Sequence, residues 1–359
     1  MHIVFTVTTD LNFDQRMMRI CHSLATAGYE VLLVGRKQRQ SIPLEQHIYQ
    51  QKRLNCWFQK GPFFYAEYNI RLFFFLLFHS ADCICAIDLD TILPCLVVSK
   101  LKRTKRVYDA HELFCEMKEI VQRPIIYKIW KWIERHSVPH FNKGYTVNEP
   151  IALEFKKLYG VNYQVVSNIA VLRSMEPIEK KSKFILYQGA VNEGRSFETL
   201  IPAMKKVNAQ LIICGEGNYF QQAKNLVQQH QLENKVIFKG WVPPTELRKI
   251  TQAATIGITL FDATGLSNYY SLANRFFDYI HAGIPQICVD FPVYRSINEN
   301  FEVAVLVRQL NAADLSTAMN NLLENTVLYE KLQTNCMLAS LKYNWQEEEK
   351  KLLQFYAAL

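Results

Sequence analysis

The sequence lacks the patterns that mark a disulfide-stapled, zinc-binding or membrane-spanning protein. Its 359 residues include nine cysteines, an odd number, and no CxxC pair occurs. We therefore expect a protein of a reducing compartment, with neither a disulfide framework nor a zinc site. The greasiest run, residues 72–78, is far shorter than the roughly 20 residues that a membrane-spanning helix needs.

Other absences narrow the class further. There is no fixed-period repeat and no low-complexity tract, and the start, MHIVFTVTTD, turns polar too early for a signal peptide. We therefore expect a cytoplasmic protein that is not integral to the membrane. A hydrophobic fraction of 49% and a charged fraction of 21% are typical of a globular chain. The length suits two compact cores better than one.

The net charge of +8 indicates an anionic partner or simply a basic surface. No nucleic-acid-binding module and no dense basic stripe is present, so we predict no nucleic-acid partner. An aromatic and basic stretch instead suggests peripheral contact with an anionic membrane, although its rings could equally belong to the core. It contains Trp57, Lys60, Phe63, Phe64 and Arg71.

Short apolar runs alternate with helical patterns almost from end to end, which predicts parallel sheets covered by helices on both faces. The predicted strands are residues 3–7, 31–34, 83–87, 106–109, 144–147, 184–187, 210–214, 236–238, 256–260, 285–289 and 304–307. The predicted helices are residues 14–27, 68–78, 91–102, 113–137 with a break near Pro124, 197–207, 219–230, 245–253, 272–281 and 312–323.

A polar stretch without an apolar period, residues 174–182, separates the two series. We therefore predict a first domain over residues 1–173 and a second over residues 174–340. The segment 341–359 contains an amphipathic helix that we expect to pack back on the first domain.

Ligands of parallel sheets bind beyond the carboxyl ends of the strands, so glycines and polar groups at those ends are candidate site residues. Gly189, Gly194 and Arg195 precede the predicted helix 197–207. Glycine backbone without side chains, the amides at a helix start and a guanidinium together suit phosphate binding. The alternative is an ordinary turn with a solvated arginine. Gly215 and Glu216 favour a tight turn between a strand and a helix. The alternative is that the backbone at these residues accommodates a nucleotide base.

The richest segment is residues 267–285. Ser271 and Asn274 fall where a helix starts, so they cap it or leave amides facing a phosphate. Asn274, Asp278 and His281 share one helical face, and Asp278 is placed to accept ribose hydroxyls. The alternative for Asp278 is a carboxylate that only favours the helix dipole.

His111 lies in a polar loop after a predicted strand, beside Asp109 and Glu112. A lone histidine usually makes local hydrogen bonds, but its place at a strand end raises its interest. The loop lacks HExxH spacing, so we predict no metal site.

Six motifs together resemble the GT-B glycosyltransferases, specifically the retaining family 4 (group 1). Four are LYQGAVNEGRSFETLIPAM (186–204), LIICGEG (211–217), KVIFKGWVPPTELRKI (235–250) and SLANRFFDYIHAGIPQI (271–287). Two less distinctive ones are DQRMMRICHSLATAGYEVLLVG (14–35) and YDAHE (108–112). The resemblance implies two Rossmann-like domains facing across a cleft, with an acceptor-binding first domain and a donor-binding second domain. It further implies retention of anomeric configuration and no metal or cofactor.

The resemblance also implies roles for particular residues. His111, Arg195 and Asp278 would be catalytic: His111 near the donor sugar, Arg195 on the diphosphate and Asp278 on the ribose. Ser271 and Leu272 would offer backbone amides to the diphosphate. Tyr270 departs from the family, because it stands where a glutamate is common and supplies no carboxylate.

We therefore expect a hexosyltransferase-type enzyme (EC 2.4) of cell-surface polysaccharide synthesis. It would move a sugar from a UDP- or GDP-sugar to a glycan or lipid-linked acceptor. A sugar-nucleotide epimerase on the same fold, and a noncatalytic sugar-nucleotide-binding protein, remain alternatives.

Overall fold

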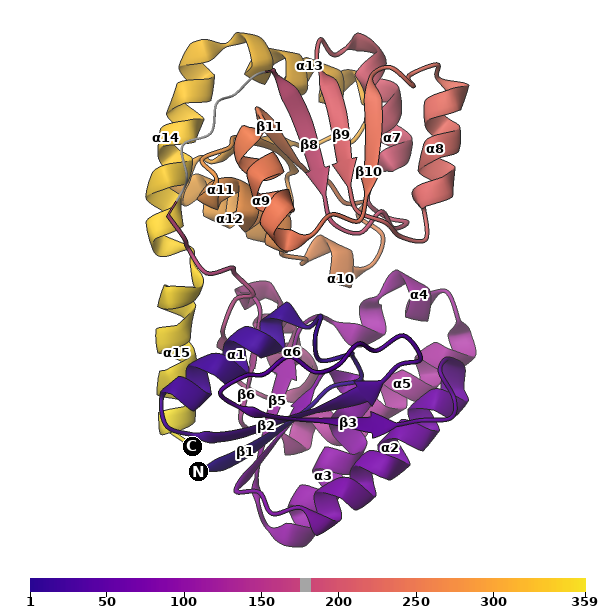
Figure 1. Cartoon of the computed structure of the whole chain (residues 1–359), viewed down its shortest axis with the longest axis vertical. Coiled ribbons are helices and arrows are strands. Elements are labelled where there is room, and N and C mark those ends of the chain that lie inside the picture. Colours follow the sequence, from indigo (N-terminus) through magenta and orange to yellow (C-terminus); the bar gives the residue numbers. More distant parts are fainter. Residues whose placement is uncertain (175–181) are drawn as a thin grey trace. The chain divides into compact units, whose positions relative to one another are not determined.

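The computed structural model describes residues 1–174 and 182–359, which divide into two units (Figure 1). The first unit contains Met1–Asn168 and Glu348–Leu359, and the second contains Ile169–Glu347. Each unit has its own parallel sheet with helices, so the predicted class of two Rossmann-like α/β units is confirmed. The connection predicted at residues 174–182 consists mostly of residues 175–181, which lie outside the described part.

The first unit has a seven-stranded sheet in the order β3-β2-β1-β4-β5-β6-β7, in which every neighbouring pair is parallel. The strands are β1 (His2–Thr6), β2 (Glu30–Lys37), β3 (Gln50–Asn55), β4 (Cys83–Ile87), β5 (Lys105–Ala110), β6 (Gly144–Thr146) and β7 (Gln164–Val165). The helices are α1 (Gln15–Thr26), α2 (Gly61–Phe78), α3 (Ile92–Lys102), α4 (Lys118–Val121), α5 (Pro124–Ser137) and α6 (Glu149–Tyr159).

The second unit has a six-stranded sheet in the order β10-β9-β8-β11-β12-β13, again parallel throughout. The strands are β8 (Phe184–Gln188), β9 (Gln210–Cys214), β10 (Val236–Gly240), β11 (Ile256–Thr259), β12 (Gln286–Val289) and β13 (Ala304–Val307). The helices are α7 (Phe197–Ala203), α8 (Phe220–Gln229), α9 (Pro244–Ala253), α10 (Leu266–Tyr269), α11 (Asn274–His281), α12 (Pro292–Phe301), α13 (Ala312–Glu324) and α14 (Thr326–Lys342).

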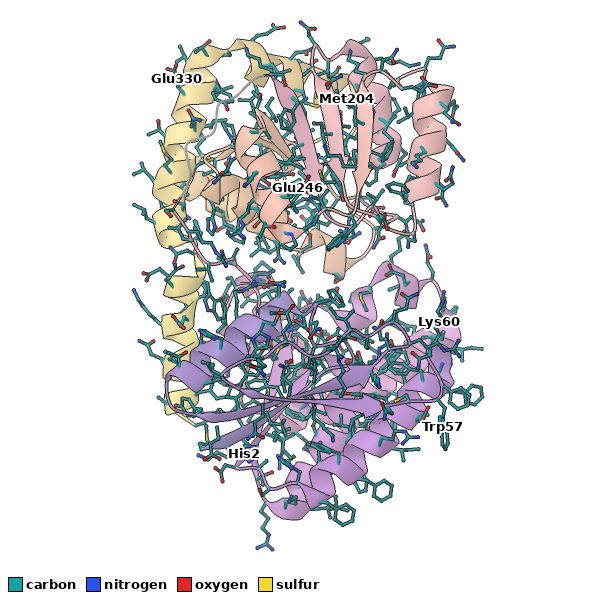
Figure 2. The ribbon with its side chains drawn as sticks, in the orientation of Figure 1. His2, Trp57, Lys60, Met204, Glu246 and Glu330 are labelled. Atoms are coloured by element: carbon teal, nitrogen blue, oxygen red, sulfur yellow. The ribbon has the colours of Figure 1, made fainter. Side chains whose placement is uncertain are left out.

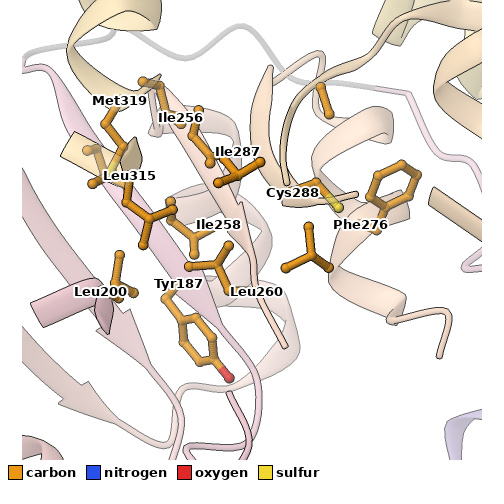
Figure 3. Packing of buried hydrophobic residues seen from close by; sticks show 14 of the residues in the cluster. Tyr187, Leu200, Ile256, Ile258, Leu260, Phe276, Ile287, Cys288, Leu315 and Met319 are labelled. Atoms are coloured by element: carbon orange, nitrogen blue, oxygen red, sulfur yellow. The ribbon is translucent and has the colours of Figure 1, made fainter. Parts of the chain in front are cut away.

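The core of the second unit shows why its strands read as continuous apolar runs. Alternate residues of β11, Ile256 and Ile258, pack against Leu315 and Met319 of α13 (Figure 3). Between them, Gly257 faces α11, where a Cβ would lie 2.4 Å from the ring of Tyr279. Both faces of the strand are thus buried, as expected for a parallel sheet.

The last helix, α15 (Trp345–Ala357), ends within the first unit. The Phe355 ring lies 5.1 Å from that of Tyr145, and the Tyr356 hydroxyl lies 3.4 Å from the Tyr145 hydroxyl. Both side chains are buried. The carboxyl-terminal residues therefore complete the core of the first unit.

Two predicted helix boundaries can be compared with the structure. The break predicted near Pro124 is confirmed, because this proline starts α5, at a position where its missing amide hydrogen costs nothing. The helix predicted at 68–78 starts earlier, at Gly61, because Pro62 occupies its first turn. The aromatic residues from Phe63 onward obscure the apolar period that marks such a start.

Candidate functional site

Two glycine turns meet at the carboxyl edge of the second unit's sheet. Gly189 follows β8 and Gly215 follows β9, with φ of +115° and +141°. A Cβ on Gly215 would lie 1.9 Å from the Gly189 carbonyl oxygen. The Gly189 amide donates to the Cys214 carbonyl at 2.9 Å, and the Gly215 amide donates to the Gly240 carbonyl at 2.7 Å. The edge therefore presents closely packed bare backbone, which a ligand can approach without meeting side chains.

Beside Gly215, Glu216 is exposed, and its carbonyl accepts from the Val191 amide at 3.0 Å. Its carboxylate oxygen lies 3.1 Å from the position of a Cβ on Gly240. Glu216 thus joins the loops that follow β8, β9 and β10. Its role towards a nucleotide base stays a prediction.

Arg195 lies at the same edge, and its side chain packs against a neighbouring segment. The Gly194 carbonyl accepts from the Asp262 amide at 3.0 Å, which ties this loop to the end of β11. The Arg195 guanidinium carbon lies 4.3 Å from the ring centroid of Phe261, a distance at which a cation is attracted to the ring. The next residue, Ser196, has a left-handed φ of +61°. The structure therefore holds this guanidinium against Phe261, in the segment that follows β11.

The predicted helix-start residues are placed less simply. Ser271 and Leu272 lie in the connection between α10 and α11, and Asn274 is the first residue of α11. The Ser271 amide donates to the Asn268 carbonyl at 3.1 Å, while the Ala273 amide donates to the Tyr294 hydroxyl at 3.0 Å. Because the Ser271 amide already has a protein acceptor, a diphosphate would have to compete for it. The assignment of Ser271 and Leu272 stays a prediction.

Asp278 is oriented by a residue that the sequence reasoning did not assign to the site. The buried Gln188, the last residue of β8, donates its side-chain amide to the Asp278 carboxylate at 2.8 Å. The side-chain Oε1 of Gln188 accepts from the Thr251 hydroxyl at 2.7 Å. This series of hydrogen bonds, from Thr251 through Gln188 to Asp278, directs the carboxylate to the strand end next to Gly189. A buried glutamine ending an otherwise apolar strand, directly before a glycine, was the available signal.

His281, which shares the helical face of Asp278, has a different role. Its Nε2 lies 2.7 Å from the Tyr343 carbonyl oxygen. Burial lowers the pKa of His281, although this hydrogen bond opposes the effect. His281 therefore ties α11 to the end of α14.

In the first unit, His111 is held between two carboxylates. Its Nδ1 lies 3.1 Å from Asp88 Oδ2 and its Nε2 lies 3.3 Å from Asp109 Oδ2. Burial lowers its pKa, but the charges of Asp88 and Asp109 outweigh that effect and raise the pKa of His111 to about 10. His111 is therefore an imidazolium at neutral pH, able to donate hydrogen bonds but not to accept a proton.

Further charges surround this histidine. The fully buried Asp109 forms an ion pair with Arg16 at 2.8 Å. Burial and the nearby Asp88 raise the pKa of Asp90 to about 7, although its hydrogen bond from Thr8 opposes them. Among the residues that the structure describes, no group of three or more His, Cys, Asp and Glu is arranged to hold a metal ion.

The backbone of Asp88 is strained, with φ +54° and ψ −179°. Residues other than glycine rarely adopt this conformation, and it persists where its surroundings enforce it. Here the Asp88 amide donates to the Asp109 carbonyl at 2.9 Å, and the Asp88 carboxylate accepts from the His111 amide at 2.8 Å. The strain thus serves to hold His111 between its two carboxylates.

The aromatic stretch before and within α2 is divided between core and surface. Phe64 is 3% exposed and belongs to the core, whereas Phe63 is 70% and Trp57 is 83% exposed. Trp57 is labelled in Figure 2 and precedes α2. Arg71 stacks on Trp57 at 4.9 Å and pairs with Glu67 at 2.8 Å. No helix of the described residues is both long and apolar enough to span a bilayer.

The second unit resembles a known protein family. Residues 169–337 match the family model described as glycosyl transferases group 1. This region is therefore similar to the group 1 glycosyltransferases. It contains Gly189, Arg195, Gly215 and Asp278, together with the other residues predicted to bind the nucleotide.

Among curated proteins, a poly(glycerol-phosphate) alpha-glucosyltransferase of Bacillus subtilis is 26% identical over 160 residues, covering 42% of this chain and 22% of the relative. The chain spans less than half the length of the curated relatives it matches. For a second relative, which is 23% identical over 186 residues, the match covers 46% of its length. Among solved structures, sucrose-phosphate synthase from Thermosynechococcus elongatus has a TM-score of 0.82 and 16% identity, covering 99% of this chain and 98% of that one.

HepE of Anabaena, solved in complex with UDP and glucose, has a TM-score of 0.77 and 13% identity and covers 100% of both chains. At such low identity these structures show that the fold is shared. The predicted GT-B fold class is thereby confirmed.

Proposed function

We propose that the chain is a hexosyltransferase-type glycosyltransferase whose second unit binds the nucleotide part of a nucleotide-sugar donor. The observation that carries this proposal is the carboxyl edge of the second sheet. There, bare backbone at Gly189 and Gly215, the stacked guanidinium of Arg195 and the oriented carboxylate of Asp278 occur within the region that matches the family. The Arg195 guanidinium is suited to pair with a diphosphate, and the Asp278 carboxylate is suited to accept hydrogen bonds from the two ribose hydroxyls.

In glycosyl transfer, the bond between the anomeric carbon and the phosphate oxygen breaks as the acceptor oxygen bonds to that carbon. Negative charge grows on the departing diphosphate, and fixed cations stabilise it. Arg195 is the proposed cation. We propose a front-face attack, one of the routes that retain configuration, in which the acceptor's proton passes to the departing phosphate oxygen. His111 is already protonated, so we assign it a positioning role rather than that of nucleophile or base.

We further propose a UDP-sugar as donor, transferred with retention. The fold shared with HepE, which was solved with UDP and glucose, supports UDP over GDP. The curated relative is named an alpha-glucosyltransferase acting on poly(glycerol-phosphate). Because UDP-glucose carries an α-linked sugar, an α-linked product means retention. The same name supports a polymeric acceptor, which fits the expected role in cell-surface polysaccharide synthesis.

We also propose peripheral contact with the cytoplasmic face of an anionic membrane. The exposed rings of Trp57 and Phe63 flank the basic Lys60 at the start of α2. Apolar rings beside basic side chains suit the boundary between lipid tails and anionic headgroups. Sedimentation of the protein with vesicles containing anionic lipid, but not with neutral vesicles, supports this contact. A Trp57→Ala/Phe63→Ala variant that sediments like the wild type contradicts it.

The donor proposal is tested with the purified full chain and a thermal-shift panel of UDP-, GDP- and ADP-glucose. A ligand that binds only the folded state raises the Tm. We expect UDP-glucose to raise the Tm most. No shift with any nucleotide sugar would refute the proposal.

Transfer itself is followed by release of UDP from UDP-glucose, with and without a lipid and glycan extract. Transfer predicts release that depends on the extract. Conversion of the sugar without extract would instead establish the epimerase. Binding without any turnover would establish the noncatalytic protein, which the absence of a carboxylate at Tyr270 favours.

A further inference from the structure

A second guanidinium lies buried at the carboxyl edge of the second sheet. Arg275, on the first turn of α11, is 8% exposed. Its guanidinium carbon lies 4.8 Å from the ring centroid of Tyr187 and 4.7 Å from that of Phe261. Two aromatic side chains therefore hold the charged group, one from β8 and one from the segment after β11.

The charge of Arg275 is not balanced by the described residues around it. Its Nη2 donates to the Leu260 carbonyl at 3.3 Å, while its Nε is buried without a hydrogen-bond acceptor in the described part of the chain. No carboxylate of the described residues forms an ion pair with it, in contrast to the buried Arg16, which is paired with Asp109. A buried charge normally requires a partner, because leaving water is costly.

The position of this charge coincides with the proposed donor site. A Cβ built on Gly189 would lie 3.3 Å from Arg275 Nη1, so the guanidinium adjoins the bare backbone of that turn. The ring of Phe261 also carries the guanidinium of Arg195, at 4.3 Å. Two guanidinium groups thus lie against the same ring, which concentrates positive charge at this edge.

We propose that Arg275 is the second cation of an anion site at the ends of β8 and β11, whose ligand is the diphosphate of the donor. This rests on the proposed function, because it names a further residue of the donor site. Arg275 supplies positive charge from beneath the Gly189 turn and, through Phe261, positions Arg195. The diphosphate supplies the negative charge that pairs with Arg275.

The test compares Arg275→Met with the wild type in isothermal titrations with UDP, uridine and inorganic pyrophosphate. One charge-assisted interaction corresponds to a loss of about 10- to 100-fold in affinity for UDP and pyrophosphate. Uridine lacks phosphate, so its affinity should change less than about twofold. A variant that loses UDP and uridine affinity equally would overturn the proposal.

Stability supplies a second readout that a structural arginine would not share. Removing an unbalanced buried charge should leave the ligand-free Tm unchanged or raise it, whereas loss of a structural arginine lowers it. Lys342→Met is the matched control: it removes a cation stacked on Phe301 and Tyr343 in the same unit. It should leave UDP affinity unchanged.

Further outcomes separate the two proposals. Arg275→Lys keeps the charge and should retain more affinity for pyrophosphate than Arg275→Met; equal loss in both would overturn an electrostatic role. If the wild type binds pyrophosphate but no UDP-sugar, the anion site stands and the nucleotide-sugar proposal fails. If it binds neither UDP nor pyrophosphate, both fail.

Discussion

The two sheets end in opposite electrostatic arrangements. At the carboxyl edge of the first unit, charged side chains satisfy one another: Asp109 pairs with Arg16, and His111 lies between Asp88 and Asp109. In the second unit, Arg275 lies against aromatic rings with no carboxylate partner among the described residues. A self-paired cluster is a stable scaffold, whereas an unbalanced buried charge at a strand end is prepared for an anion.

Breaking the pairing in the first unit should have the largest effect. Asp109→Asn leaves the buried Arg16 without its partner, and loss of one member of a buried pair costs about 3–5 kcal/mol. We expect a corresponding fall in the free energy of unfolding, measured with denaturant. Glu302→Gln is the control, because its ion pair with Lys331 is solvent-exposed and should cost less than about 1 kcal/mol. Equal losses would show that Arg16 is not held by Asp109.

In the second unit, Arg195→Ala should affect turnover rather than folding. Loss of one group that stabilises developing charge typically reduces kcat by about 10²–10³-fold. The Tm should change little, because the Arg195 side chain is only partly buried. Arg248→Ala, which removes an exposed guanidinium from α9, is the control and should keep wild-type rates. Near-wild-type turnover of Arg195→Ala would refute its role.

Gly215→Ala tests whether the two glycine turns are as close as described. The added Cβ would meet the Gly189 carbonyl at 1.9 Å, and such overpacking costs about 1–3 kcal/mol. We expect a lower Tm together with weaker UDP binding. Gly160→Ala is a useful comparison: it shares a positive φ, but its Cβ would meet nothing within 4 Å. If both variants behave alike, backbone strain alone explains the effect.

Asp88→Asn should lower the pKa of His111 towards its ordinary value of 6.5, with Asp109 still keeping it raised. The stability that protonated His111 contributes is complete below its unfolded pKa and is lost as the pH rises through its folded pKa. The wild type should therefore lose this contribution near pH 10, and the variant at lower pH. NMR titration of the ring protons, assigned with His111→Gln, measures the shift. An unchanged pKa would remove Asp88 from the cluster.

The smallest expected effect is a gain in stability, from replacing Ser196 with glycine. Ser196 has a left-handed φ of +61°, which glycine adopts without strain. We expect Ser196→Gly to raise the free energy of unfolding by up to about 1 kcal/mol, the size of the strain relieved. Chemical denaturation measures this change. A loss of stability would show that the buried Ser196 hydroxyl has a favourable role.

The fold could be predicted from sequence because its strands are buried on both faces and therefore appear as short apolar runs. β3 was missed because this edge strand, QQKRLN, is polar and half exposed. The order of the strands is likewise a tertiary property that no local pattern encodes.

The candidate site was predictable where local chemistry suffices, as for the glycines and for Arg195 before a helix. Gln188 acts only because α11 brings Asp278 within hydrogen-bond distance of it, 90 positions away. Arg275 directly precedes the buried Phe276 and Phe277 in an amphipathic helix, and its stacking rings come from two other segments. That the Ser271 amide is used by Asn268 depends on the short helix α10, which has no clear sequence signal.

The most direct measurement is a crystal structure of the full chain with UDP. The diphosphate is predicted to lie about 3 Å from the Arg195 guanidinium, above the Gly189 turn, with the ribose hydroxyls on the Asp278 carboxylate. A diphosphate bound elsewhere, or an Arg195 side chain turned away from it, would contradict the assignment of the donor site.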